Sequence, residues 1–208
     1  MFIARIPLNA ARDEAQQLIS SPYKLHSAVE HSFPPGVARS NESGRILWRL
    51  DMNAHDSYSV WLYVVSPQKP DFTHIAEQAG WPLYGEWESK DYTILLNRLA
   101  KGQQWRFRLR ANPVRKAAHD FGSKSHEDII GKIQGHVTVR QQTQWLLDRA
   151  REHGFQVLES DSIPQVIISQ RQKQQFMRKG ATVSLSTALF DGALEITDAE
   201  AFRKALCF

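Results

Sequence analysis

Apolar and polar residues recur in the first hundred positions with the periods of strands and helices. Runs that are rich in aromatic and β-branched residues, or that alternate with period two, predict strands at residues 2–8, 45–51, 58–65 and 91–96. Helical periods predict helices at residues 10–19, at 72–78, and from Ser21 as N-cap, with Pro22 behind it, to about residue 33. This order, β-α-β-β-α-β, is that of the ferredoxin-like unit.

The second half repeats most of that order. A strand at 105–111 and a polar, glycine-punctuated loop at 121–135 precede a helix at 141–153, which Gly154 ends. Strands are expected at 156–159, 164–170 and 182–190; a hairpin turn at Asp191-Gly192 leads to a strand at 193–196, and Asp198 caps a helix at 199–206. No closing strand follows. We therefore expect an α+β protein of two tandem ferredoxin-like (RRM-like) βαββαβ domains, residues 1–100 and 101–208, the second incomplete at its C-terminus, as if the chain ended early.

The strand at 105–111 separates two kinds of side chain onto its two faces. One face is apolar, and the other carries Arg106, Arg108 and Arg110. Like charges along one strand face repel each other unless water or an anion lies against them. Arg115 and Lys116 extend the positive strip. The pattern fits a nucleic-acid contact and a solvated outer face of a sheet about equally well.

A second basic segment, residues 171–180, links two of the predicted strands. It carries Arg171, Lys173, Arg178 and Lys179 and no acidic residue. A basic hairpin tip can lie against a nucleic-acid backbone, where the contacts are sensitive to salt. The alternative is a solubilising loop that protects a sheet edge, where lysine is common.

Composition narrows the class of protein. The chain has 208 residues, of which 42% are hydrophobic, and a formal net charge of +4, so it can build real cores and favours an anionic partner. No apolar run is long enough to span a membrane, and the N-terminus does not have the form of a signal peptide. Cys207 is the only cysteine. A reduced, cytoplasmic location without membrane association fits best.

Tyr23 and His26 lie three residues apart in the second predicted helix and therefore share one face. Histidine titrates near neutral pH and suits proton transfer, and RNA supplies its own nucleophile in the 2′-hydroxyl group. The alternative is that both side chains merely pack or face solvent. The other histidines have no ligand spacing, so we expect neither a metal site nor a cofactor.

Four segments together resemble one known family. They are residues 21–26 (Ser-Pro-Tyr-Lys-Leu-His), 107–113 (Phe-Arg-Leu-Arg-Ala-Asn-Pro), 144–146 (Gln-Trp-Leu) and 188–194 (Ala-Leu-Phe-Asp-Gly-Ala-Leu). The chain is similar over nearly its whole length to the CasE family, the CRISPR repeat-processing endoribonucleases of type I-E systems. Family members end with a glycine-rich loop and a closing strand, whereas this sequence stops at Phe208, where that loop would begin.

The resemblance implies metal-independent cleavage of CRISPR precursor RNA at the base of each repeat hairpin, with the protein remaining bound as a Cascade subunit. It implies that His26 is catalytic with Tyr23 assisting, and that the basic hairpin contacts the repeat stem. The expected partners are the repeat RNA hairpin and other Cascade subunits, and we expect a monomer when the protein is free. A non-catalytic RNA-hairpin-binding module, or a truncated inactive form, is the alternative. A plain protein-interaction scaffold is a third reading, which predicts no salt-dependent RNA binding.

Overall fold

The computed structural model describes residues 1–35, 44–52, 56, 58–82, 86–116, 133–178 and 181–207. The chain folds into two compact units, one made of Met1–Leu99 with Arg203–Phe208 and the other of Ala100–Phe202. The sequence predicted two domains, residues 1–100 and 101–208, and that these are independently folding domains stays a prediction. In the part of the chain that the structure describes, no helix is long and apolar enough to cross a membrane.

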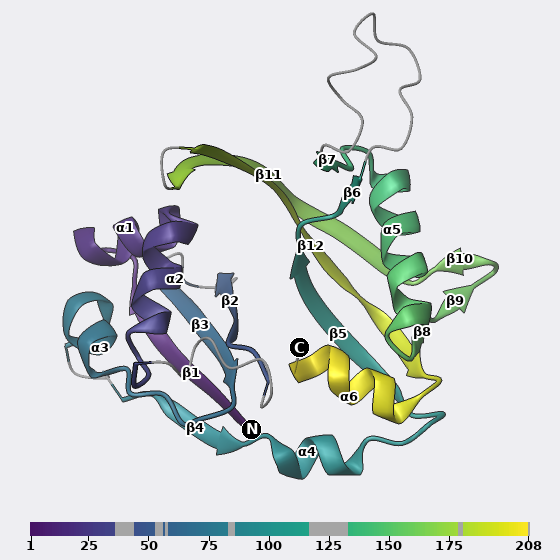
Figure 1. The fold of residues 1–208 in the computed structure, drawn as a ribbon, viewed down its shortest axis with the longest axis horizontal. Coiled ribbons are helices and arrows are strands. Elements are labelled where there is room, and N and C mark those ends of the chain that lie inside the picture. The colour runs from purple at the N-terminus through teal and green to yellow at the C-terminus, as the bar shows by residue number, and fades with distance from the viewer. Residues whose placement is uncertain are drawn as a thin grey trace, which may run out of the picture. The chain divides into compact units, whose positions relative to one another are not determined.

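The first unit is a four-stranded antiparallel sheet with helices on one face. Its elements are β1 (Phe2–Asn9), α1 (Asp13–Ser20), α2 (Pro22–Glu30), β2 (Leu47–Met52), β3 (Ser59–Ser66), α3 (Thr73–Ala79), β4 (Glu88–Asp91) and α4 (Thr93–Arg98). The strand order β2-β3-β1-β4 is the ferredoxin-like order that the sequence predicted (Figure 1).

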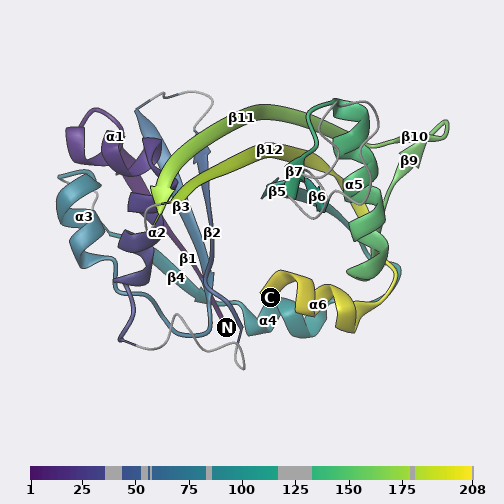
Figure 2. The same ribbon diagram turned by 45° about the horizontal axis from the view of Figure 1, so that its top comes forward.

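The core of this unit follows from strand and helix periods. Alternate residues of β3, among them Leu62, are buried against α1, α2 and α3, which gather on one side of the sheet (Figure 2). From α2, Leu25 and Val29 enter the same core, one turn apart. The C-terminal segment joins this unit because Arg203 donates hydrogen bonds to the carbonyl groups of Leu96 and Leu99, at 2.8 and 2.9 Å.

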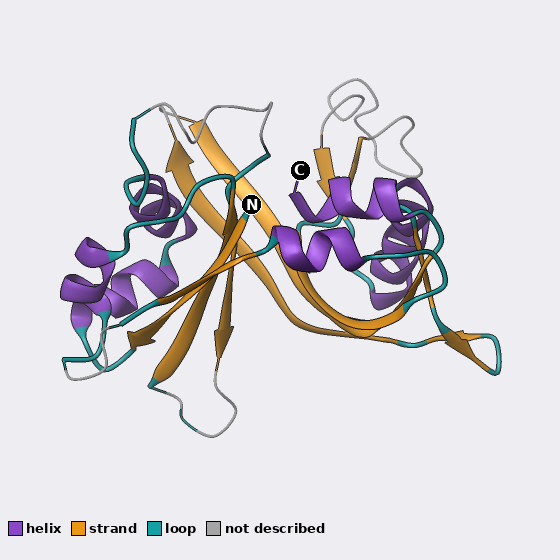
Figure 3. Cartoon of the chain, turned by 90° about the horizontal axis from the view of Figure 1, so that it is seen from below, coloured by secondary structure: helices purple, strands orange, loops and turns teal. Residues whose placement is uncertain are grey.

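The second unit is built on two long antiparallel strands, which Figure 3 shows as the longest in the chain. Its elements are β5 (Gln104–Ala111), β6 (Val114–Lys116), β7 (Ile133–Gly135), α5 (Val139–Glu152), β8 (Phe155–Val157), β9 (Glu159–Ser160), β10 (Ile163–Pro164), β11 (Val166–Arg178) and β12 (Ala181–Ile196), followed by α6 (Ala199–Cys207). The main sheet has the order β11-β12-β5, and β8 also pairs with β12.

One face of that sheet packs on α5. Leu146 of α5 and Phe190 of β12 belong to the core, and Phe107 of β5 packs against them. Thr138 caps α5 in a capping box with Gln141, and Gly154 ends the helical segment with a φ of 72°, as predicted. Among the described residues, β12 is the strand of this sheet that pairs with β5.

Three sequence predictions in this unit and one in the first need correction. The hairpin at Asp191-Gly192 is wrong: β12 runs straight through, because β5 and β11 pair with these residues from both sides. Residues 171–178 of the basic segment are not a loop, since β11 continues to Arg178, and residues 179 and 180 lie outside the described residues. Within the predicted loop 121–135, residues 133–135 form β7 and the rest lies outside the described residues.

In the first unit, 91–96 is not a strand: β4 ends at Asp91, whose carboxylate accepts a hydrogen bond from the Thr93 amide at 2.9 Å and so opens α4.

Candidate active site and nucleic-acid interface

Helix α2 holds the two candidate catalytic residues, and its sequence explains why it forms. The Ser21 side chain accepts a hydrogen bond from the Lys24 amide at 3.3 Å, and Pro22 occupies the first helical turn. The far end of the helix is tied to α3, because His74 Nε2 lies 3.0 Å from the Ala28 carbonyl oxygen. The helix is therefore fixed at both ends, and its exposed face has a defined orientation within its unit.

Tyr23 and His26 lie on that exposed face, three residues apart. Tyr23 is 52% exposed, and the His26 side chain is equally open. His26 Nε2 lies 3.3 Å from Oε1 of Glu30, one turn further along the helix. Glu30 was not among the predicted site residues, although its i+4 spacing from His26 is visible in the sequence. An exposed tyrosine and histidine beside a carboxylate can bind a phosphate and move protons.

The arginine strand is β5, and its three arginines lie on the sheet face opposite the core residue Phe107. Arg108 forms a two-point ion pair with Asp191 of β12: Nε lies 2.6 Å from Oδ1 and a terminal nitrogen 3.2 Å from Oδ2. Arg110 donates a hydrogen bond to the side-chain oxygen of Gln170. Arg106 is exposed. The repulsion expected along this strand is thus relieved in part by groups of the same unit.

Arg115 and Lys116 are exposed on β6, which pairs with β7. Next to β7, burial and, to a smaller degree, the charge of Arg115 hold the pKa of His136 below its ordinary value. His136 was not predicted to have a role, because nothing in its spacing along the sequence points to this neighbour. Its neutral form is the favoured one, and it can donate or accept a hydrogen bond.

Arg171 and Lys173 of β11 line a pocket of about 630 Å³ together with His136. The strand register shifts in a β-bulge between Ser169 and Gln172, and Gln170 within it has a φ of 44°, a conformation that non-glycine residues rarely adopt. Arg171 donates a hydrogen bond to the Val137 carbonyl oxygen at 3.3 Å. This pocket collects two predicted RNA-binding cations and one residue that the sequence missed.

The remaining two predicted cations belong to the far end of β11 and to the segment after it. Arg178 is the last residue of β11, paired with Ala181 of β12. Lys179 lies outside the described residues.

The predicted RNA-binding residues do not all share one surface of the sheet. Lys173 is the register partner of Ser186, and Arg108 is the partner of Asp191. Ser186 and Asp191 are five residues apart on β12, and an odd spacing puts side chains on opposite faces of a strand. Arg108 and Lys173 therefore project from opposite faces of the sheet, whereas Arg110 reaches Gln170, which lines the β11 pocket.

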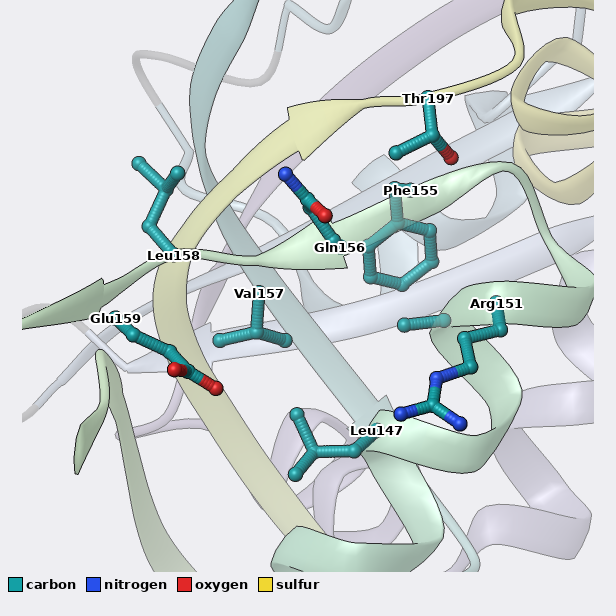
Figure 4. A pocket seen from close by; sticks show the side chains of 9 residues that line it. Leu147, Arg151, Phe155, Gln156, Val157, Leu158, Glu159 and Thr197 are labelled. Atoms are coloured by element: carbon teal, nitrogen blue, oxygen red, sulfur yellow. The ribbon is translucent and has the colours of Figure 1, made fainter. Parts of the chain in front are cut away.

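A further pocket of about 500 Å³ lies between α5 and β8 in the same unit. Figure 4 shows Leu147 and Phe155 at its apolar part, with Arg151 from α5 beside them and Glu159 on the opposite side. Among the described residues, no group of three or more His, Cys, Asp or Glu side chains is placed to hold a metal ion.

A family model described as "CRISPR associated protein" matches residues 1–208, the full length of the chain. The chain belongs to this family. The CRISPR-associated endoribonuclease Cse3 of Thermus thermophilus is 29% identical over 96% of this chain and 88% of its own length. The predicted membership of the type I-E CasE family is thereby confirmed.

Solved structures agree with this assignment. The structure of CRISPR endoribonuclease Cse3 bound to a 19-nucleotide RNA superposes with a TM-score of 0.74 and 27% identity, covering 98% of this chain and 92% of that one. Cas6e from Escherichia coli K-12 matches with a TM-score of 0.62 and 21% identity, covering 98% of this chain and 91% of that one, a likeness of fold. The predicted α+β fold with tandem ferredoxin-like units is confirmed.

Proposed function

We propose that this chain is an endoribonuclease that cuts CRISPR precursor RNA at the base of the repeat hairpin and stays bound to the product as a Cascade subunit. The observation that carries the proposal is the match over 98% of the chain to a Cse3 structure bound to RNA, with Tyr23 and His26 together on an exposed, rigidly held helix face. We also expect the free protein to be a monomer. A cytoplasmic location without membrane association is proposed because the proposed substrate is a transcript and the chain has a single cysteine, Cys207.

The chemistry needs only groups that the RNA, α2 and solvent water supply. The 2′-oxygen attacks the adjacent phosphorus, the bond from phosphorus to the 5′-oxygen breaks, and the products carry a cyclic 2′,3′-phosphate and a 5′-hydroxyl. His26 moves a proton in this step, and the Tyr23 hydroxyl donates a hydrogen bond to the phosphate. No cofactor takes part in this scheme.

The basic residues would hold the stem. Arg171 and Lys173 converge on one pocket, where phosphate oxygens would meet both cations, and Arg106 is exposed on the other face of the sheet. The full proposed RNA-binding set consists of Arg106, Arg108, Arg110, Arg115, Lys116, Arg171, Lys173, Arg178 and Lys179.

The test is cleavage of a CRISPR-type RNA hairpin in EDTA. We expect His26→Ala to lower the cleavage rate by about 100-fold to 10,000-fold with the dissociation constant nearly unchanged, because only proton transfer is lost. The matched control is His31→Ala: this ring lies at the end of the same helix, with Nδ1 2.6 Å from the Ser27 carbonyl oxygen. We expect the control to cut like the parent, and a hairpin with deoxyribose at the cut to remain intact.

Two outcomes would contradict the proposal. Tight, salt-sensitive binding by a parent protein that does not cut would favour the non-catalytic RNA-binding module. Cleavage that survives in both His26→Ala and the deoxyribose substrate would assign the chemistry to other groups.

A further inference from the structure

Glu30 lies one helical turn beyond His26, and its carboxylate faces one particular nitrogen of the imidazole ring. The separation of 3.3 Å joins Nε2 of His26 to Oε1 of Glu30. Both residues belong to α2, whose Leu25 and Val29 are buried on the other face. The spacing of the pair is therefore set by a helix that is itself held in place.

The carboxylate beside one ring nitrogen favours one position for the proton of the neutral imidazole. An ionised carboxylate has no hydrogen to donate and can only accept. Its negative charge stabilises a hydrogen on the ring nitrogen beside it, so the contact of 3.3 Å favours neutral His26 protonated at Nε2. Since neutral imidazole has one N–H group, the lone pair is on Nδ1.

We infer that Glu30 is a positioning residue for His26, which holds Nε2–H toward the carboxylate and leaves Nδ1 to exchange a proton with the RNA. This inference rests on the proposed ribonuclease function and specifies which atom of its histidine reacts. Glu30 does not touch the substrate. It orients the ring in the way that a carboxylate orients histidine in other acid–base sites.

Nδ1 of neutral His26 takes the proton of the 2′-hydroxyl as the 2′-oxygen bonds to phosphorus. The bond between phosphorus and the 5′-oxygen breaks, and that oxygen takes a proton from solvent water to leave as a hydroxyl. The imidazolium that forms has both nitrogens protonated, with Nε2–H toward Glu30, and it returns the Nδ1 proton to water before the next cycle.

The pair matters more in the complex than in the free protein. The side chains of His26 and Glu30 are 52% and 44% exposed, and ion pairs in water contribute little to the free energy of folding. An RNA stem laid over α2 would exclude water from the pair and strengthen its attraction. The effect of Glu30 should thus appear in the rate of cleavage rather than in the stability of the fold.

The first test compares Glu30→Ala and Glu30→Gln in single-turnover cleavage with saturating RNA hairpin. We expect Glu30→Ala to lower the rate constant about tenfold with a dissociation constant within about twofold of the parent, because orientation is lost but the general base remains. Glu30→Gln keeps an acceptor oxygen and should retain the rate to within about threefold. Glu14→Ala, which removes an exposed carboxylate from α1, is the matched control and should cut like the parent. Equal rates for the parent, Glu30→Ala and Glu30→Gln would overturn the inference, since the carboxylate would then have no role in the chemical step.

The second test reads the tautomer directly and needs no RNA. In a ¹⁵N-labelled protein at a pH where His26 is neutral, its Nε2 should have the chemical shift of a protonated nitrogen and Nδ1 that of an unprotonated one; the signals are assigned by their loss in His26→Asn. In Glu30→Ala both shifts should move toward each other. A proton on Nδ1 in the parent would overturn this inference while leaving cleavage by His26 intact. A parent with the expected tautomer that does not cut RNA would instead overturn the proposed function.

Discussion

Arg108 and Asp191 face each other directly across β5 and β12, with two short contacts between guanidinium and carboxylate. The arginine strand therefore carries its own counter-charge at its centre. An RNA phosphate that approaches Arg108 must compete with Asp191, whereas one that approaches Arg106 meets an exposed guanidinium. Asp191 thus lowers the share of the binding energy that Arg108 can give to an anion.

Removing the counter-charge should strengthen RNA binding. We expect Asp191→Asn to tighten binding of an RNA hairpin about threefold at about 50 mM salt and to lose the gain at about 200 mM, because the released guanidinium acts by charge. The free energy of unfolding should fall by only about 0.5 kcal/mol, the usual value for an exposed pair. Fluorescence anisotropy at the two salt concentrations measures the first effect, and urea denaturation the second. Weaker binding by Asp191→Asn would mean that Arg108 must be held by Asp191 to meet the RNA.

The two cations of the β11 pocket should each count as one phosphate contact. We expect Arg171→Gln and Lys173→Gln to weaken RNA binding about threefold to tenfold at low salt, and each to reduce the slope of log affinity against log salt by about 1. The control is Arg149→Gln on α5, whose side chain lies 2.7 Å from Glu152 and outside the pocket. Titrations over a range of salt concentrations give the slopes. Unchanged slopes in both variants would remove this pocket from the RNA interface.

Substitutions at two glycines in the second unit should distinguish the cost of backbone strain from the cost of a steric clash. Gly102 and Gly154 have φ values of 84° and 72°, which cost a residue with a Cβ about 1 kcal/mol or more. A Cβ at Gly102 would meet nothing within 4 Å, but one at Gly154 would lie 2.4 Å from the Asp198 carbonyl oxygen. We expect Gly102→Ala to lower the free energy of unfolding by about 1 kcal/mol and Gly154→Ala by about 3 kcal/mol or more. Denaturant titration of both variants checks this; equal losses would show that the α5–β8 connection relaxes around the new methyl group.

His136 should make the fold sensitive to acid. Burial first, and the charge of Arg115 second, lower its pKa in the folded protein, so the unfolded chain binds a proton more readily. The contribution to stability is complete above the ordinary histidine pKa and is lost as the pH falls through that value. We expect the parent to lose more stability than His136→Gln between about pH 7.5 and about pH 5.5. In an NMR titration, Arg115→Gln should raise the pKa of His136 only in part, since burial remains; no change would leave burial as the sole cause.

Local rules predicted the elements that local chemistry controls. Ser21 and Pro22 predicted the start of α2, and the period-two runs placed β1 and β3 to within about two residues. Gly154 was predicted to end the helix before it, and its φ is above zero, as a helix-ending glycine requires. The incorrect predictions lie where pairing with neighbouring strands determines the local conformation. Asp191-Gly192 has the composition of a turn, but strands on both sides supply hydrogen bonds to an extended chain, and β12 continues through it.

The candidate site divides in the same way. Tyr23, His26 and Glu30 share a helix face because of their spacing, which is readable from the sequence. The hydrogen-bond partners of the arginines cannot be read from the sequence, because they depend on the register of the strands. Asp191 lies opposite Arg108, and Gln170 accepts from Arg110 only because a β-bulge turns it toward β5.

The sequence by itself determined the fold class, the family and the helix that carries the candidate chemistry, since periodicity, caps and a few motifs act over one or two turns of chain. The tertiary structure alone decided that Arg108 and Lys173 project from opposite faces of one sheet, that Arg108 is paired, and that His136 joins Arg171 and Lys173. Those relationships join positions far apart in sequence, and they follow from strand pairing and side-chain packing, which no local pattern encodes.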